Sequence, residues 1–228
     1  MGKELSVEAI AGMIDHTVLA PYSKREVFVA ACRYAVKNRC ASVCVCPFFV
    51  GECAQRLNGS GVKTCTVIGF PHGTTSTASK VAESLIAMES GAVEIDMVVN
   101  IAKVKDHDWD YVQEDIWAVT KVVHAVGNKI KVIFENCFLE TEEKIELCKI
   151  CTELNCDWVK TSTGFGTSGS TVEDLLLMKA NIGPHVQIKA AGGIRTLDQL
   201  IEAREAGATR VGCSRTKDVL DEARRRFG

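Results

Sequence analysis

The sequence has 228 residues, of which 46% are hydrophobic and 25% charged, and its formal net charge is -2 at pH 7. This size and composition are typical of a globular protein with a substantial buried core. The small net charge excludes the strongly basic surface that binding to nucleic acid or to an anionic membrane requires. We therefore expect small-molecule partners.

The N-terminal segment and the cysteines indicate a cytoplasmic protein. Residues 1–17 contain no apolar stretch long enough for a secretion signal or a membrane span. The eleven cysteines are an odd number without an export signal, so we expect reduced thiols. Cys148 and Cys151 form a CxxC pair inside a helical pattern, which favours packing over metal or redox chemistry.

Short β-rich runs alternate with longer segments of helical periodicity along the chain, after a short predicted helix at 6–13. The predicted strands are 13–19, 41–47, 62–70, 92–99, 129–136, 157–162, 186–191 and 209–214. The predicted helices that follow them are 23–39, 48–59, 77–91, 108–127, 141–155, 171–181, 196–207 and 216–227.

Most of the strand runs are continuously apolar, which is typical of parallel strands covered on both faces. Eight strand–helix units predict a closed (β/α)8 TIM barrel, and no linker or low-complexity stretch divides the chain, so we expect one domain over residues 1–228. A doubly wound open sheet is the alternative.

Glycine-rich turns follow the last three predicted strands. Residues 164–169 spell GxGxxG, but the next strand has no acidic residue at its end, where a dinucleotide site needs one. Glycines let backbone N–H groups approach an anion, and the loops after strands seven and eight form the usual phosphate site of a barrel. We therefore expect a phosphate monoester to bind there, although each glycine alone is an ordinary turn former. The predicted substrate-binding residues in these turns are Thr163, Gly164, Gly192, Gly193, Gly212 and Ser214.

Lys160 and Lys189 lie near the carboxyl ends of the sixth and seventh strands, where a barrel keeps its active site. Two inward-pointing ammonium groups repel each other and burial disfavours the charged form, so one amine should lose its proton readily. A neutral lysine attacks a carbonyl and forms a Schiff base, which then acts as an electron sink. The alternative is a pair of phosphate-binding or ion-paired lysines.

Asp96, at the end of the fourth strand run, is the predicted acid–base partner of these lysines. An acid in a parallel core strand is costly unless it has a partner, so we expect Asp96 to pair with Lys189, as a proton carrier or only as an ion pair. We expect Glu94, on the same face but deeper, and Glu135 to form supporting ion pairs.

Four further residues have weaker signals. Asp15 is a candidate acid near the lysines, and Cys44 a candidate residue of the pocket wall. His16 is more typical of a core or loop histidine. His72 lies in a polar loop, where substrate contact and an ordinary loop role are both open.

Motifs along nearly the whole chain resemble the deoxyribose-phosphate aldolases. They are IDHTVL, SVCVCP, GFPHGTTSTASKVAE, EIDMVVN, DWVKTSTGFG, IKAAGGIRT and VGCS. The resemblance implies a (β/α)8 barrel and a class I aldolase without metal or other cofactor. Such an enzyme reversibly cleaves 2-deoxy-D-ribose 5-phosphate to D-glyceraldehyde 3-phosphate and acetaldehyde.

The resemblance also implies residue roles. Lys160 would be the Schiff-base lysine, Lys189 the lysine that perturbs it, and Asp96 their acid–base partner. Asp15 and Cys44 would lie at the pocket. Family members commonly form dimers, so a homodimer is expected.

The sequence departs from the family pattern in places. It ends in RRRFG, so the tyrosine tail of some members has no counterpart, and Cys46 and His72 replace an asparagine and a leucine. Two other classes stay open at this point. One is a sugar-phosphate isomerase or epimerase using Asp96 and a second carboxylate, and the other is a phosphate binder without catalysis.

Overall fold

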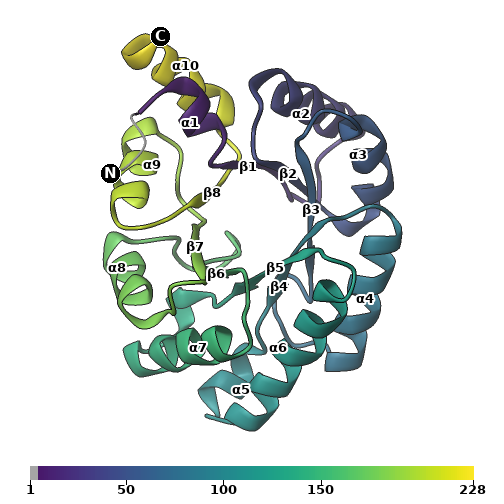
Figure 1. Cartoon of the computed structure of the whole chain (residues 1–228), viewed down its shortest axis with the longest axis vertical. Coiled ribbons are helices and arrows are strands. Elements are labelled where there is room, and N and C mark those ends of the chain that lie inside the picture. Colours follow the sequence, from purple (N-terminus) through teal and green to yellow (C-terminus); the bar gives the residue numbers. More distant parts are fainter. Residues whose placement is uncertain (1–4) are drawn as a thin grey trace.

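Eight parallel strands form a closed barrel in sequential order (Figure 1). This is a computed structural model, and the structure describes residues 5–228. The strands are β1 (Ile14–Val18), β2 (Ser42–Val45), β3 (Lys63–Ile68), β4 (Glu94–Val98), β5 (Lys129–Ile133), β6 (Trp158–Lys160), β7 (Gln187–Ala190) and β8 (Arg210–Cys213). The first and last strands pair with each other, with Ile14 opposite Val211. The predicted (β/α)8 barrel is confirmed, and the open-sheet alternative is wrong.

Helices surround the barrel (Figure 1). They are α1 (Val7–Ala11), α2 (Arg25–Asn38), α3 (Val50–Leu57), α4 (Thr77–Glu89), α5 (Ile101–Lys105), α6 (Trp109–His124), α7 (Thr141–Glu153), α8 (Val172–Asn181), α9 (Leu197–Glu205) and α10 (Thr216–Phe227). The predicted short helix before the first strand is α1, which Ser6 caps. Helix α5 was not predicted; it begins after Asn100, whose side chain caps it. Within residues 5–228, no helix has both the length and the apolar character to cross a membrane.

The strands are buried on both faces, but the two faces differ in chemistry. All five residues of β4 are buried. Ile95 and Met97 belong to the main hydrophobic core of the protein. Asp96 and Glu94 alternate with them and contact Lys131 of β5. The barrel interior therefore carries a buried charged layer, which the apolar core around it shields from water.

The GxGxxG segment packs against the loop after β7. A Cβ atom on Gly169 would lie 2.2 Å from the carbonyl oxygen of Gly192, so only glycine allows this approach. The next amide, Ser170 N–H, donates to Ala191 O at 3.0 Å and to Gly192 O at 3.1 Å. The motif thus fixes the loop after β6 against the loop after β7, where the predicted phosphate turns lie.

Candidate active site

Lys160 and Lys189 converge on one carboxylate oxygen in the barrel. They are direct neighbours in the β6–β7 register. The Nζ atom of Lys160 donates to Asp96 Oδ2 at 2.8 Å, and the Nζ atom of Lys189 donates to the same oxygen at 2.7 Å. All three side chains are at most 3% exposed. The structure therefore brings the three predicted catalytic residues together.

The second oxygen of Asp96 is also occupied, by residues that the sequence analysis did not select. Lys131 Nζ donates to Asp96 Oδ1 at 2.9 Å, and the Cys65 thiol donates to the same atom at 3.3 Å. Asp96 lies opposite Lys131 in the β4–β5 register, and both are central rather than terminal in their strands. These contacts fix the carboxylate so that Oδ2 faces Lys160 and Lys189.

A second set of ion pairs lies beside Asp96. Asp15 contacts Lys189 at 2.6 Å and Arg210 at 2.5 Å. Glu94 contacts Lys131 at 2.6 Å and Arg210 at 3.0 Å, as expected for a supporting ion pair. Arg210 was not predicted to belong to the site. Each of these charges thus has an opposite partner, which offsets the large cost of removing it from water.

The electrostatic balance keeps these groups ionised. Burial alone would raise the pKa of Asp96, but attraction by Lys131, Lys160 and Lys189 outweighs burial and holds the pKa well below its usual range. Burial would also raise the pKa of Asp15, but attraction by nearby cations, of which Lys189 is the strongest, outweighs burial and lowers it. Burial would lower the pKa of Lys189, but Asp15 and Asp96 raise it above its ordinary value. Lys189 is therefore a stable cation next to Lys160.

These shifts predict an acid-labile barrel. A carboxylate with a lowered pKa in the folded state stabilises the fold above its unfolded pKa of about 4, and this contribution disappears as pH falls below that value. For each such group, the free energy of unfolding falls by up to about 1.4 kcal/mol per pH unit. We expect the free energy of unfolding, measured with urea between pH 6 and pH 3, to fall less steeply in Asp15→Asn than in the parent. Glu114→Gln, which alters an exposed residue, should keep the parent slope; equal slopes in all three proteins would contradict the prediction.

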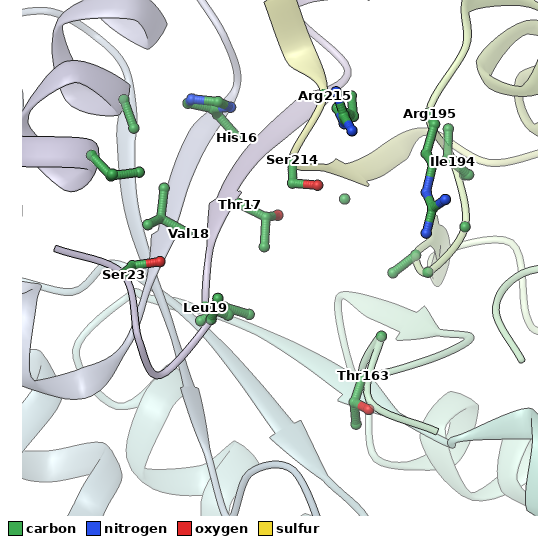
Figure 2. Close-up of a pocket in the computed structure, with 18 of the residues that line it drawn as sticks. His16, Thr17, Val18, Leu19, Ser23, Thr163, Ile194, Arg195, Ser214 and Arg215 are labelled. Carbon is green, nitrogen blue, oxygen red and sulfur yellow. The ribbon is translucent and has the colours of Figure 1, made fainter. Parts of the chain in front are cut away.

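A cavity of about 840 Å³ opens above the charged layer, and Lys160 lies on its wall. The six residues predicted in the glycine-rich turns line this cavity with it, namely Thr163, Gly164, Gly192, Gly193, Gly212 and Ser214. Figure 2 shows Thr163, Arg195 and Ser214 around the same space, each on a different loop. Gly192 and Gly193 have φ angles of 78° and 82°, which glycine adopts without strain.

The cavity wall also carries cations that the sequence analysis did not assign. Arg195, Arg215 and Lys217 lie on the loops and helix start that follow β7 and β8. They add positive charge on the side where the glycine turns offer backbone N–H groups. This wall is suited to a phosphate monoester.

The two lysines differ in access to this cavity. Lys160 lines it and has one carboxylate partner, Asp96. Lys189 is 1% exposed and lies between Asp15 and Asp96. Of the two amines, Lys160 is the one that a ligand in the cavity can reach.

Three other candidates, Asp15, Cys44 and His16, are buried side chains. Asp15 and Cys44 are 0% and 1% exposed and lie in the barrel interior, so their contact with substrate stays a prediction. His16 hydrogen-bonds through Nδ1 to Thr216 Oγ1 at 2.7 Å. It is thus a buried histidine with a partner, although its ring borders the cavity.

The ion pair predicted for Glu135 is wrong. Its side chain accepts hydrogen bonds from the backbone N–H and the hydroxyl of Thr163, and no ion pair of Glu135 occurs within residues 5–228. The backbone at Glu135 is left-handed, with φ of 59°, and this turn directs the side chain toward the loop after β6. Glu135 therefore orients Thr163 rather than neutralising a cation.

Among the described residues, two groups of potential metal ligands lie in the interior, one of which consists of Asp15, Cys65 and Glu94. The ligand atoms of Cys44, Cys65 and Asp96 are within 4.8 Å of one another. Both oxygens of Asp96 already accept hydrogen bonds from the Nζ atoms of lysines. A metal ion would have to displace these lysine side chains, so the arrangement favours amine chemistry.

Comparison with known proteins agrees with this geometry. Residues 9–217 match the model of the DeoC/LacD family aldolase. A deoxyribose-phosphate aldolase of Rhodopirellula baltica is 51% identical over 219 residues, which cover 96% of this chain and 91% of the relative. One of Thermococcus gammatolerans is 48% identical over 94% of this chain and 96% of its own length.

A solved structure of a deoxyribose phosphate aldolase has a similar fold. The tetrameric deoxyribose phosphate aldolase of Aeropyrum pernix superposes with a TM-score of 0.90 at 28% identity, over 96% of this chain and 92% of that one. Because the match of sequence and fold extends over nearly the whole chain, we conclude that the chain belongs to the DeoC/LacD family of aldolases.

Proposed function

We propose that this aldolase reversibly cleaves 2-deoxy-D-ribose 5-phosphate to D-glyceraldehyde 3-phosphate and acetaldehyde through a Schiff base on Lys160. One observation carries the proposal: the Lys160 amine shares an Asp96 oxygen with the Lys189 ammonium and opens into a cavity lined by glycine-rich turns. The names of the relatives support the choice of substrate.

In this proposal the cavity orients the open-chain sugar. The 5-phosphate binds the N–H groups of Gly192, Gly193 and Gly212 and the Ser214 hydroxyl, with Arg195 as a cation. The aldehyde carbon then lies at the Lys160 end of the cavity. Two fixed ends hold the sugar in an attack geometry and reduce the entropic cost of the reaction.

The reaction then follows from the three central residues. Lys160 adds to C1, and loss of water gives the imine. The protonated imine accepts the electrons of the C2–C3 bond as the C3 hydroxyl loses its proton, which releases glyceraldehyde 3-phosphate. Asp96, ionised at rest, accepts protons, and Lys189 exchanges them with the same oxygen. Protonation of C2 and hydrolysis of the imine release acetaldehyde and restore the amine.

Trapping tests this proposal directly. Acetaldehyde and borohydride should convert the imine into a stable ethylamine, which peptide mass mapping should locate on Lys160. The absence of a reduced adduct, or its location on another lysine, would contradict the assignment. An isomerase or epimerase would turn over sugar phosphate without any trapped adduct.

The phosphate subsite gives a separate prediction. Arg195→Ala should raise KM for deoxyribose 5-phosphate about tenfold or more, since a charge-assisted hydrogen bond contributes about 1.5–3 kcal/mol. The rate of acetaldehyde adduct formation should be unchanged, because acetaldehyde has no phosphate. Arg33→Ala, which removes an exposed cation on α2, is the matched control. Equal effects of Arg195→Ala on both measurements would contradict a phosphate role.

We also propose that the enzyme acts in the cytoplasm, as a homo-oligomer. All eleven cysteines are free thiols, including buried ones, as a reducing compartment maintains. The relative from Aeropyrum pernix is a tetramer, and the family resemblance favours a dimer. Size measurement in solution at several protein concentrations distinguishes these states.

A further inference from the structure

A second cavity of about 950 Å³ lies beside the first, above the carboxyl ends of β3 and β4. It contains the two residues that replace those of the family pattern, Cys46 and His72, for which the proposed reaction has no role. Leu19, Thr163 and Phe165 line both cavities. The second cavity is therefore continuous with the wall of the cavity that contains Lys160.

The chemistry of the second cavity differs from that of the first. Its wall is mainly apolar, with contributions from Val67, Ile68, Phe70, Ile101 and Phe138. None of the described residues on this wall is lysine or arginine. A phosphate group would find no cation there, whereas an apolar group would lose contact with water.

The carboxylates on this wall are already engaged. Both oxygens of Glu135 accept hydrogen bonds from Thr163, and Glu83 accepts from Gly69 N–H at 2.7 Å. The surface left for a ligand is mainly apolar. At the border with the first cavity, the rings of Phe70 and Phe165 meet edge to face, with centroids 5.4 Å apart.

We propose that this second cavity is a subsite for the alkyl chain of donor aldehydes longer than acetaldehyde. The inference rests on the proposed function. The phosphorylated acceptor fills the cationic side of the first cavity, which leaves the adjoining apolar cavity for a substituent on C2 of a Lys160-bound aldehyde. The volume lies within the range of small-molecule sites, and a short alkyl chain fills only part of it.

The reaction with a longer donor uses the same bonds as the reverse of sugar cleavage. Lys160 condenses with the donor aldehyde and releases water, and C2 of the imine loses a proton to give the enamine. C2 then bonds to the aldehyde carbon of glyceraldehyde 3-phosphate, whose oxygen takes up a proton. Water hydrolyses the imine and releases a product with an alkyl branch on C2.

The test compares acetaldehyde with butanal as donors to glyceraldehyde 3-phosphate. Butanal has two more carbons, and burial of each methylene contributes a factor of about four in binding, or roughly 15-fold for both. We expect Ala102→Phe and Cys46→Phe, which fill the second cavity, to lower kcat/KM for butanal about 15-fold and to change that for acetaldehyde less than about twofold. Val126→Phe, at an exposed turn outside the cavity, is the matched control.

The outcomes separate this inference from the proposed function. If the parent enzyme cleaves deoxyribose 5-phosphate but forms no butanal adduct with borohydride, the subsite is refuted and the proposed function stands. Equal losses for both donors in the cavity-filling variants also refute the subsite. If neither sugar cleavage nor any aldehyde adduct occurs, the proposed function itself fails. Selective loss of butanal use supports the subsite.

Discussion

Lys160→Leu should lower kcat for deoxyribose 5-phosphate cleavage by about four orders of magnitude or more, because no other described amine on the cavity wall shares the contact with Asp96. Leucine retains much of the lysine stem and keeps the cavity closed toward the interior. Asp96 retains two cations, Lys131 and Lys189, so the carboxylate stays paired. The loss should therefore be chemical rather than structural.

Two measurements establish this distinction. Borohydride should trap no aldehyde on Lys160→Leu, while the affinity for the unreactive alcohol 2-deoxyribitol 5-phosphate stays within a few-fold of the parent. Lys63→Leu, which replaces an exposed lysine at the start of β3, should leave both properties unchanged. Substantial cleavage by Lys160→Leu would refute the covalent mechanism.

Asp96→Asn should reduce both activity and stability. The amide cannot carry protons, and loss of acid–base catalysis typically costs a factor of about 10²–10⁴ in kcat. It also leaves Lys131, Lys160 and Lys189 without their shared anion, and breaking a buried ion pair costs about 3–5 kcal/mol in the free energy of unfolding. Assays at a temperature where the variant is folded, together with urea titration, measure the two effects.

A buried acid outside the site provides the matched control for Asp96→Asn. Asp115 on α6 pairs with Lys80 on α4 at 2.5 Å, and both side chains are at most 1% exposed. Asp115→Asn should lower the free energy of unfolding by a similar amount and leave kcat of the folded enzyme near the parent value. If Asp115→Asn and Asp96→Asn affect kcat equally, the role of Asp96 as proton carrier is refuted.

The fold was predictable because its signal is repeated. Buried parallel strands read as apolar runs, and eight of them alternating with helical patterns leave few architectures. Helix α5 was missed because five residues show little periodicity, and its N-cap, Asn100, also suits a turn. Local patterns therefore determine the long elements better than the short ones.

The site was predictable only in part, because the amino-acid sequence does not show which residues lie opposite each other in neighbouring strands. Lys160 and Lys189 were found from their place near strand ends. Lys131 and Arg210 look in sequence like solvated cations. Only the strand register, which places Lys131 opposite Asp96 and Arg210 opposite Lys189, makes them part of the network. Glu135 was misassigned because its left-handed backbone, invisible in sequence, turns the carboxylate toward Thr163.

Because β1 pairs with β8, the site cannot be complete until the last strand of the barrel has been synthesised. Arg210, which contacts both Asp15 and Glu94, follows Asp15 by 195 residues, so the ribosome makes it long after the first strand. A nascent chain that lacks β8 has neither this cation nor a closed barrel around Lys160. The amine therefore acquires these surroundings only after β8 has been synthesised, so a chain that has not reached β8 does not hold the complete charged network.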